Sequence, residues 1–353
     1  MQQSVVVDWT SPAEGYLGNV LEQPTALSRF LDSAPGLAES VRGIDLADRP
    51  RVILSGMGSS HWATFSAWQM LAAAGLPVWW VDTAQLLDVA GGLIVPGSLV
   101  WLTSQSGESA ETVALLDTLN LSDVHVLGVT NAPDSTLGRR ADSRIDLLAG
   151  DEVSVSSKSF LNTVAASALV VGEYMGQTQD VVGCLRRTVD RAAQFLNELD
   201  AHVRTASTTF ASDQHILLTG RGTAAASASA AGLIIKEAAK VLVEGMSAGA
   251  LRHGPIELAG PGLNVTFFDH GSGSHHDQNV RLAEDLAAAG SSVAWVSDDA
   301  PAGATRLPAP DADGIDLTIR DALAFQTISF ALAQRKGIPA GTFSVASKVT
   351  DIL

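Results

Sequence analysis

Leu99–Leu116, LVWLTSQSGESAETVALL, is the stretch that decides the fold this sequence predicts. It begins with apolar, β-prone residues, passes through hydroxyl side chains around one glycine, and continues in a helix-like pattern. A strand that leads through small polar residues into a helix offers backbone N–H groups and the positive end of the helix dipole to an anion. The loop contains no lysine, so we predict neutral donors that suit a phosphate monoester. An N-capped helix after a buried strand is the alternative for this stretch alone.

The same alternation of strand and helix runs through the first half of the chain. Apolar runs that read as strands lie at 51–56, 78–81, 99–103 and 124–129. Strands that alternate with helices are typical of βαβ units around a parallel sheet, whose ligands bind outside the carboxyl ends of the strands. The loops Gly58-Ser59-Ser60 and Ser104–Ser109 both follow predicted strands. We therefore expect both loops at one edge of the sheet, where they form a phosphate cradle.

The second half repeats this pattern after two long helical segments between Lys158 and Leu199, which are broken near Gly176. Its predicted strands lie at 215–219, 241–243 and 265–268, and its Ala-rich helix lies at 224–240. The loop Asp269–Ser274 is the counterpart of Ser104–Ser109 but lacks its serine-rich form. We predict two α/β halves, about 45–175 and 205–353, related by internal duplication, with phosphate bound in the first half.

Composition narrows the class of protein. The 353 residues are 46% hydrophobic and 17% charged, which predicts a large core. A formal net charge of -16 argues against nucleic acid and anionic membrane as partners. The single cysteine, Cys184, excludes an internal disulfide and fits a reducing compartment. Because no apolar run approaches the ~20 residues that span a bilayer and the N-terminus lacks signal-peptide features, we expect a soluble, cytoplasmic protein.

Four motifs together resemble the double sugar-isomerase (SIS) domain family. They are Gly58–His61, Ser104–Ser109, Lys236-Glu237 with Glu244 and Ala248–Pro255, and Ser347–Thr350. In this order they are similar to the family's G-T/S-S loop, its S-Q-S-G-E-T phosphate loop, its K-E … E-x-x-x-A-x-E-L-K-H-G-P segment and its closing lysine segment. The family includes the isomerase domain of glucosamine-6-phosphate synthase, aminosugar-phosphate deaminases and fructosamine-6-phosphate deglycases.

The resemblance covers nearly the whole chain and implies an α/β fold. It implies two SIS-type, flavodoxin-like subdomains, each with three α/β/α layers and a parallel sheet. We predict an N-terminal helical arm at 1–44 and a first subdomain with the phosphate loop and linking helices at 45–200. A second subdomain at 201–353 carries Lys236-Glu237, His253 and the lysine tail. The resemblance also implies a homodimer.

Catalytic and binding roles follow from the resemblance, residue by residue. Glu237 matches the base that moves a proton between C1 and C2 through an enediol, His253 the ring-opening histidine supplied by the neighbouring subunit, and Lys348 the lysine that closes over the sugar. These residue types suit proton transfer near neutral pH and stabilisation of an enediolate. The matched substrate-binding residues are Gly58, Ser59, Ser60, Ser104, Gln105, Ser106, Ser109, Val155 and Ser157. No cofactor or metal is implied.

Three departures from the family leave the reaction open. Ala230 and Ile234, two turns and one turn before the base, stand where the synthase has a glutamate and a lysine. The loop at 153–160 is one residue shorter than V-A-S-T-K, so its register is open. The chain begins Met1-Gln2 without a cysteine nucleophile, so we expect no glutaminase activity. The prediction is an isomerase or deaminase of a hexose or aminosugar 6-phosphate. The alternatives are a fructosamine-6-phosphate deglycase and a phosphosugar-binding or regulatory protein without turnover.

Simpler interpretations stand beside these roles. The simpler interpretation of Glu237 is a surface charge, that of His253 the cap of a short helix and that of Lys348 a solvated lysine. Trp79-Trp80 fits the core or a dimer contact better than a sugar platform, and Gly220–Thr223 lacks the spacing of a nucleotide loop. Further histidines and aspartates crowd one loop without the spacing of a metal site: His270, His275, His276, Asp269 and Asp277.

Overall fold

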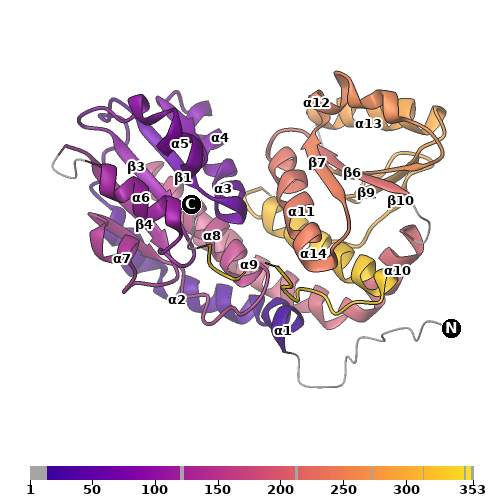
Figure 1. Ribbon diagram of the computed structural model, residues 1–353, viewed down its shortest axis with the longest axis horizontal. Helices are drawn as coiled ribbons and strands as arrows, with labels where there is room; N and C mark the ends of the chain where they lie inside the picture. Colours follow the sequence, from indigo (N-terminus) through magenta and orange to yellow (C-terminus); the bar gives the residue numbers. More distant parts are fainter. Residues whose placement is uncertain are drawn as a thin grey trace. The chain divides into compact units, whose positions relative to one another are not determined.

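The computed structural model describes residues 14–119, 123–210, 214–271, 273–312, 314–345 and 347–350 (Figure 1). The chain divides into two compact units. The first-sheet unit contains residues 22–152 and 156–189 and the C-terminal segment from Phe343. The second-sheet unit contains the chain up to Leu21, residues 153–155 and residues 190–342. Each unit contains one five-stranded sheet.

The first sheet is parallel throughout, as the sequence predicts. Its strand order is β2-β1-β3-β4-β5. Runs of β-branched and large apolar residues form these strands, and β1 and β3 are buried along their whole length because helices cover both faces. The strands are β1 (Val52–Gly56), β2 (Val78–Trp80), β3 (Leu99–Thr103), β4 (His125–Thr130) and β5 (Ser143–Asp146).

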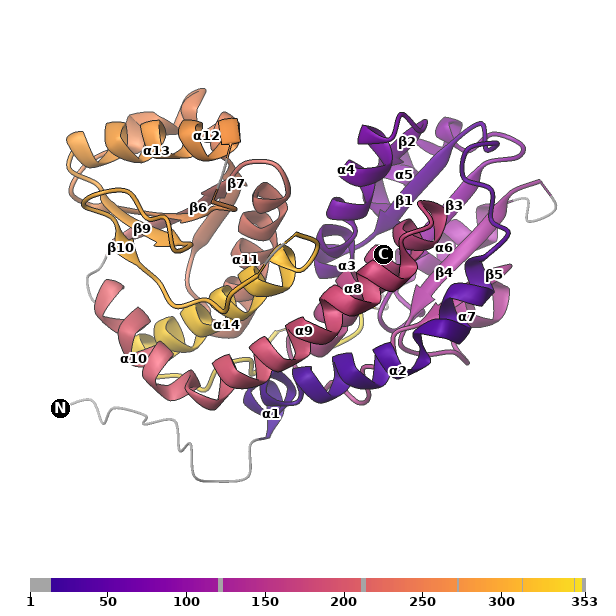
Figure 2. The same cartoon turned by 180° about the vertical axis from the view of Figure 1, so that it is seen from behind.

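Helices pack on both faces of the first sheet. The helices on the face seen in Figure 1 are α5 (Thr83–Asp88), α6 (Ala110–Thr118) and α7 (Thr136–Arg140). Across the opposite face, seen in Figure 2, lie α2 (Gln23–Val41) and α8 (Lys158–Tyr174). The other helical segments are α3 (Gly58–Ala63), α4 (Phe65–Ala73) and the 3₁₀ turn η1 (Gly91–Leu93). The helix α9 (Thr178–Asn197) carries the chain from this unit into the next.

The second sheet repeats the first, strand for strand. Its order is β10-β9-β8-β6-β7, which is the order of the first sheet when β6 is matched to β1 and β8 to β3. Every pairing in it is parallel. This shared topology agrees with the predicted internal duplication. The strands are β6 (His215–Gly220), β7 (Val243–Ser247), β8 (Leu263–Phe268), β9 (Ser292–Val296) and β10 (Thr305–Arg306).

Helices also cover both faces of the second sheet. On one face are α12 (Ala248–Arg252) and α13 (Gly273–Ala288), and on the other α11 (Thr223–Ala239) and α14 (Leu317–Lys336). The small residues of α11 permit close packing, because a Cβ on Gly232 would lie 2.8 Å from the backbone N of Gly245 in β7. The other helical segments are α1 (Gly15–Leu21), α10 (Leu199–Thr209) and the 3₁₀ turn η2 (Pro255–Leu258).

One local expectation was wrong. The strand predicted at 241–243 begins only at Val243 and continues to Ser247, because pairing with β6 aligns this segment despite its polar Glu244. The described part of the predicted N-terminal arm forms two helices, α1 and α2. α2 continues through Pro35 because its buried apolar face packs on α8. Residues 1–13 of the predicted arm lie outside the described residues.

Candidate functional site

The serine loop after β3 has the predicted strand–loop–helix form. Ser104 is the first residue after β3, and Ser109 is the N-cap of α6. The backbone N of Gly107 donates to the Ser104 hydroxyl at 3.1 Å, which closes the turn. From the segment after β4, backbone N–H groups of Asn131 and Leu137 donate to the carbonyls of Gln105 and Gly107. The loop is therefore held in shape by the neighbouring strand connection.

Gly107 is required by both backbone conformation and space. Its φ is +64°, in the left-handed region that L side chains disfavour. A Cβ at this position would lie 2.7 Å from the Cβ of Ser135 and would clash with the Ser135 hydroxyl. The glycine in the S-Q-S-G-E-S motif thus permits the close approach of the 104–109 loop to the start of α7.

Hydroxyl groups gather where this loop meets α6. The hydroxyls of Ser104 and Ser109 lie 3.5 Å apart, and that of Ser109 also donates to the Thr112 hydroxyl at 2.7 Å. The side chains of Gln105 and Ser106 are half-buried. The N-terminus of α6 adds its dipole, so the loop offers an anion neutral donors and a partial positive charge.

The second predicted loop, Gly58–Ser60, lies at the same sheet edge. It forms the first turn of α3, directly after β1, and β1 pairs with β3 so that Gly56 is opposite Thr103. A Cβ on Gly56 would lie 2.8 Å from the Thr103 carbonyl oxygen, so only glycine allows this approach. The structure therefore brings the Gly58–Ser60 and Ser104–Ser109 loops to neighbouring strand ends, as the sequence predicts.

His61, which ends the first motif, is a buried residue. Its ring stacks on Trp80 with centroids 3.6 Å apart, and the Trp80 indole N–H donates to the His61 carbonyl at 3.1 Å. Burial lowers the pKa of His61 to about 4, against the opposing attraction of Asp82. His61 is therefore neutral at pH 7. Trp80 packs on it, and the Arg51 guanidinium lies 5.4 Å from the Trp79 ring centroid.

The loop at 153–160 places its predicted site residues inward. The side chains of Val155 and Ser157 are both buried. The Ser157 hydroxyl donates to the Glu152 carboxylate at 3.1 Å. Ser157 is also the residue before α8, so its position is fixed by the start of that helix. The half-buried side chain in this segment is that of Ser156.

The C-terminal tail docks on the first-sheet unit beside the serine loop. The Lys348 ammonium lies 2.7 Å from the Glu152 carboxylate. Two residues further on, the Thr350 carbonyl accepts a hydrogen bond from the backbone N of Ala110 at 3.1 Å. Ala110 is the first residue of α6. The tail lysine and the serine loop, which the sequence predicts as parts of one site, thus belong to one unit and are joined through the tail.

Glu152 is the residue of this region that sequence reasoning missed. Its buried carboxylate accepts hydrogen bonds from the backbone and hydroxyl of both Ser157 and Ser159, in addition to Lys348. The available signal was an acidic residue shortly before a Ser-x-Ser pair at the start of a buried helix. That pattern indicates helix capping and gives no hint of the lysine.

Glu237 and Lys236 lie in the last turn of α11, in the second-sheet unit. The Glu237 side chain is half-buried, and its carbonyl accepts from the Lys240 ammonium at 2.6 Å. Ile234 and Ala230, one and two turns earlier, are both 0% exposed. The helix face that carries a glutamate and a lysine in the synthase is therefore packed in the core here.

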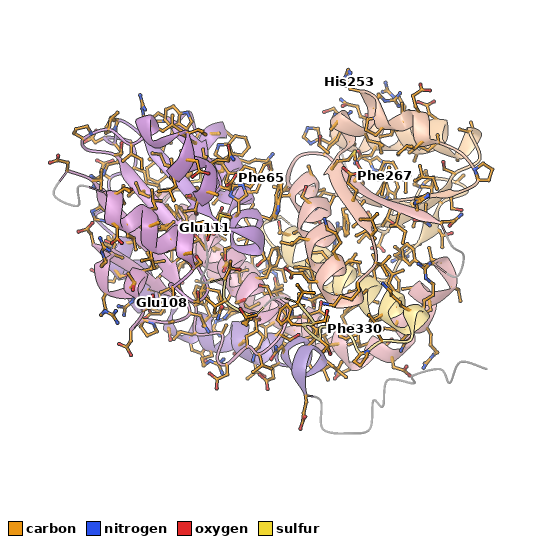
Figure 3. The ribbon with its side chains drawn as sticks, viewed as in Figure 1. Phe65, Glu108, Glu111, His253, Phe267 and Phe330 are labelled. Atoms are coloured by element: carbon orange, nitrogen blue, oxygen red, sulfur yellow. The ribbon has the colours of Figure 1, made fainter. Side chains whose placement is uncertain are left out.

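His253 lies at the surface of the second-sheet unit (Figure 3). It is the C-cap residue of α12, and its backbone N–H donates to the Ala250 carbonyl. The capping interpretation of this residue is therefore correct for its backbone. Its exposed imidazole lies within a segment that ends at Gly254, whose φ is +142°. The ring-opening role that the resemblance implies for His253 stays a prediction.

The loop after β8 differs from the serine loop in one decisive residue. Asp269 stands first after β8, as Ser104 stands first after β3. Its buried carboxylate accepts from the backbone N of Gly271, the His276 imidazole and the Asn279 amide. This loop therefore contains its own anion. That an external phosphate binds in the first half rather than the second stays a prediction.

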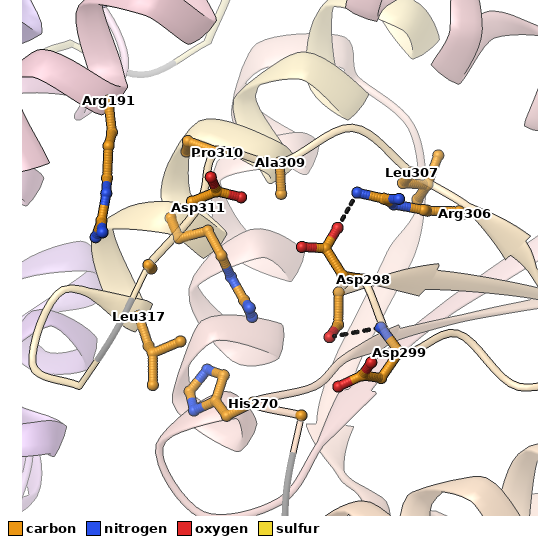
Figure 4. A pocket seen from close by; sticks show the side chains of 14 residues that line it. Arg191, His270, Asp298, Asp299, Arg306, Leu307, Ala309, Pro310, Asp311 and Leu317 are labelled. Atoms are coloured by element: carbon orange, nitrogen blue, oxygen red, sulfur yellow. Dashed lines mark hydrogen bonds and ion pairs between the residues drawn. The ribbon is translucent and has the colours of Figure 1, made fainter.

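A pocket of about 370 Å³ adjoins the loops after β8 and β9 (Figure 4). Its arginines are matched by carboxylates: Arg306 pairs with Asp298, Arg191 with Asp316, and Arg320 with Asp321. His270 is likewise bound to Asp321 at 3.0 Å. The lining therefore lacks the single sign of charge that would select an anion. Across the described parts of the chain, no cluster of His, Cys, Asp or Glu could hold a metal ion.

Comparison with known proteins finds a family match in the first half of the chain. Residues 45–171 match the family model of the SIS domain. A glutamine--fructose-6-phosphate aminotransferase [isomerizing] of Rhizobium meliloti (strain 1021) is 27% identical over 335 residues, covering 89% of this chain and 55% of that protein. The enzyme of the same name from Symbiobacterium thermophilum is 31% identical over 288 residues, covering 74% and 47%. The chain spans about half the length of these relatives.

Solved structures show the same fold over nearly the whole chain. The C-terminal domain of glucosamine-fructose-6-phosphate aminotransferase from Francisella tularensis has a TM-score of 0.79 at 20% identity, covering 94% of this chain and 99% of that one. Tagatose-6-phosphate ketose/aldose isomerase from Escherichia coli has a TM-score of 0.77 at 20% identity, covering 92% and 95%. Among the described residues, no helix is long and apolar enough to cross a membrane.

Proposed function

Residues 45–171 match the SIS domain family, and on this premise we propose that the chain is an enzyme that isomerises or deaminates a hexose or aminosugar 6-phosphate. The proposal is that the phosphate binds in the Ser104–Ser109 loop and the sugar extends from it. Proton transfer between C1 and C2 through an enediol interconverts aldose and ketose. The relatives named above carry out reactions of fructose 6-phosphate by their names, which supports this substrate class.

The observation that carries the proposal is the serine loop and its docked tail. The loop offers neutral donors and the N-terminus of α6, which suits the dianion of a phosphate monoester. In a chain with a net charge of -16, binding of such an anion depends on local donors of this kind. The Lys348 segment docks beside this loop, because the backbone N of Ala110 at the start of α6 donates to the Thr350 carbonyl, which supports a role for this lysine at the sugar.

In the proposed reaction, three side chains share the chemistry. Glu237 takes the proton from one carbon and returns it to the other. Lys348 stabilises the negative oxygen of the enediolate with its ammonium. His253, supplied by a second copy of the chain in a homodimer, opens the sugar ring. Gly58–Ser60 and the loop at 153–157 complete the proposed contacts to the phosphate and the sugar.

A second candidate is a phosphosugar-binding protein without turnover, and one observation favours it. Ala230 and Ile234 are buried and apolar, so α11 supplies neither of the ionisable groups that accompany the base in the synthase. Without that glutamate, His253 has no partner of the synthase type on α11. The binding loops require none of these groups, so phosphosugar binding would survive their loss.

Incubation with hexose 6-phosphates in D₂O separates these candidates. We expect deuterium to be incorporated at C1 or C2 of fructose 6-phosphate, glucose 6-phosphate or glucosamine 6-phosphate. Mass spectrometry and NMR detect this incorporation. Ammonia release from glucosamine 6-phosphate identifies a deaminase, and free amino acid from a fructosamine 6-phosphate identifies a deglycase. If these sugar phosphates shift the melting temperature but show no deuterium exchange and no product release, the chain is a phosphosugar-binding protein and not an enzyme. Ser104→Ala should abolish the shift in either case, because it removes a loop hydroxyl.

A further inference from the structure

Glu152 holds a negative charge inside the first-sheet unit. It lies in the connection between β5 and α8, and its side chain is 0% exposed. A buried carboxylate is unfavourable unless donors surround it. Those donors are present here, because both carboxylate oxygens accept hydrogen bonds from the first residues of α8 and the residue before it.

The donors form a preorganised socket. Ser157 and Ser159 each give a backbone N–H at 3.0 Å and a hydroxyl, at 3.1 Å and 2.6 Å respectively. Burial by itself would raise the pKa of Glu152, but the Lys348 ammonium and these hydrogen bonds outweigh it and lower the pKa. With Lys348 in place the carboxylate is therefore ionised at neutral pH, and the serine donors fix its direction.

Lys348 is the cation that fills this socket. Its ammonium lies 2.7 Å from a Glu152 oxygen, and its side chain is 24% exposed, so the pair is only partly screened by solvent. The two residues of the pair are far apart in the sequence, since Lys348 lies 196 positions after Glu152. The tail is then held a second time at Ala110 by the Thr350 carbonyl.

We propose that Glu152 is the positioning residue for Lys348, fixing the ammonium and with it the tail segment Ser347–Thr350 beside the serine loop. The inference rests on the proposed function in so far as Lys348 acts on the sugar. Glu152 itself contacts no reacting atom in this scheme. It positions the Lys348 ammonium, and the hydrogen-bond donors at the start of α8 position the Glu152 carboxylate.

A purely structural role for Glu152 makes different predictions. If Glu152 only caps α8, its loss should weaken the fold and leave the tail and the chemistry of Lys348 alone. If it positions Lys348, its loss should free the tail and have no further effect once the lysine is gone. Measurements on the tail and a double-mutant cycle distinguish these outcomes.

The first experiment measures tail docking on the full chain without any ligand. Endoproteinase Lys-C cleaves after Lys348, and intact mass spectrometry follows the loss of the residues beyond it. We expect Glu152→Gln to speed this cleavage about tenfold or more, since a charge-assisted hydrogen bond of this kind is worth about one power of ten or above. Asp117→Asn removes a carboxylate that pairs with Arg140 at the surface of the same unit and should leave the rate unchanged. Equal cleavage of Glu152→Gln and wild type overturns the proposal.

The second experiment measures turnover with the hexose phosphate that the deuterium assay identifies. Glu152→Gln should lower kcat about tenfold or more with KM within about threefold, because the phosphate loop is intact. Lys348→Met should lower kcat at least as much, and Glu152→Gln should add nothing in the Lys348→Met background. If the two substitutions lower kcat independently, so that their effects multiply in the double variant, the positioning role is wrong. If Glu152→Gln does not fold, Glu152→Asp replaces it in both experiments, since it keeps the charge but retracts the carboxylate by one methylene.

The two experiments also separate this proposal from the proposed function. If wild type shows no deuterium exchange, the proposed reaction fails, and the Lys-C rates alone decide whether Glu152 fixes the tail. If wild type turns over and Glu152→Gln matches it, the reaction stands and the positioning role is wrong.

Discussion

His61 makes a specific prediction about how the fold responds to acid. Its ring lies against Trp80, and its buried Nδ1 has no hydrogen-bond partner among the described residues. Burial lowers its pKa from 6.5 to about 4, despite the attraction of Asp82. The folded protein therefore keeps this imidazole neutral, whereas the unfolded chain protonates it as the pH falls below about 6.5.

The sign and size of the effect follow from proton linkage. Between pH 6.5 and about 4 the unfolded chain binds a proton at His61 that the folded chain does not, so stability is full above this window and is lost as the pH falls through it. The difference between the two pKa values corresponds to about 3 kcal/mol in all, of which about 2 kcal/mol has been lost at pH 5.

His61→Phe tests this reasoning because phenylalanine keeps the aromatic stack on Trp80 and cannot take a proton. The free energy of unfolding, measured by urea denaturation with tryptophan fluorescence at pH 7 and pH 5, should fall about 2 kcal/mol less in the variant than in wild type. A constant offset from packing cancels, because each protein is compared with itself. His215→Gln, at an exposed histidine, should behave as wild type. Identical pH dependence of His61→Phe and wild type would refute a buried neutral His61.

Three further predictions concern the two loops and the base. Gly107→Ala should cost about 2 kcal/mol or more of unfolding free energy, since it adds a clash with Ser135 at a positive φ; an unchanged urea midpoint contradicts this. Asp269→Asn should cost about 2 kcal/mol because the carboxylate has three donors, whereas Asp298→Asn at an exposed ion pair should cost under about 1 kcal/mol; equal losses would rule out the internal anion. Glu237→Gln should slow deuterium exchange at least about 100-fold while the phosphosugar thermal shift persists, and retained exchange would exclude it as the base.

The central strands of the first sheet were predictable because burial on both faces leaves a clear signal, whereas the half-buried edge strand β5, with polar residues at three of its four positions, was not predicted. β1 and β3 are continuous apolar runs, and each ends in glycine or small polar residues. β7 was predicted too early because three of its five residues are polar or glycine, and only its pairing with β6 defines its length. The Ala-rich α11 was predicted within one residue of its ends, since its composition and its period agree.

Glu152 was beyond sequence reasoning for a different reason. Its donors on α8 are local, and the pattern could have indicated a capped helix start. The ion pair with Lys348 joins segments 196 positions apart, and no periodicity or motif in a single sequence reports such a pairing. The same holds for Thr350 and Ala110, whose contact uses backbone atoms and leaves no mark on side-chain identity.

The duplicated sheets explain why one chain would bind one phosphate. Both loops start at equivalent positions, directly after β3 and β8, and both close a turn on a glycine N–H. Ser104 closes its turn with a neutral hydroxyl, which adds no negative charge and leaves the helix dipole of α6 to an external anion. Asp269 closes its turn with a carboxylate that takes the imidazole and amide donors of α13 as well. A second anion there would meet a buried negative charge, so we expect phosphate at the first sheet rather than at the second.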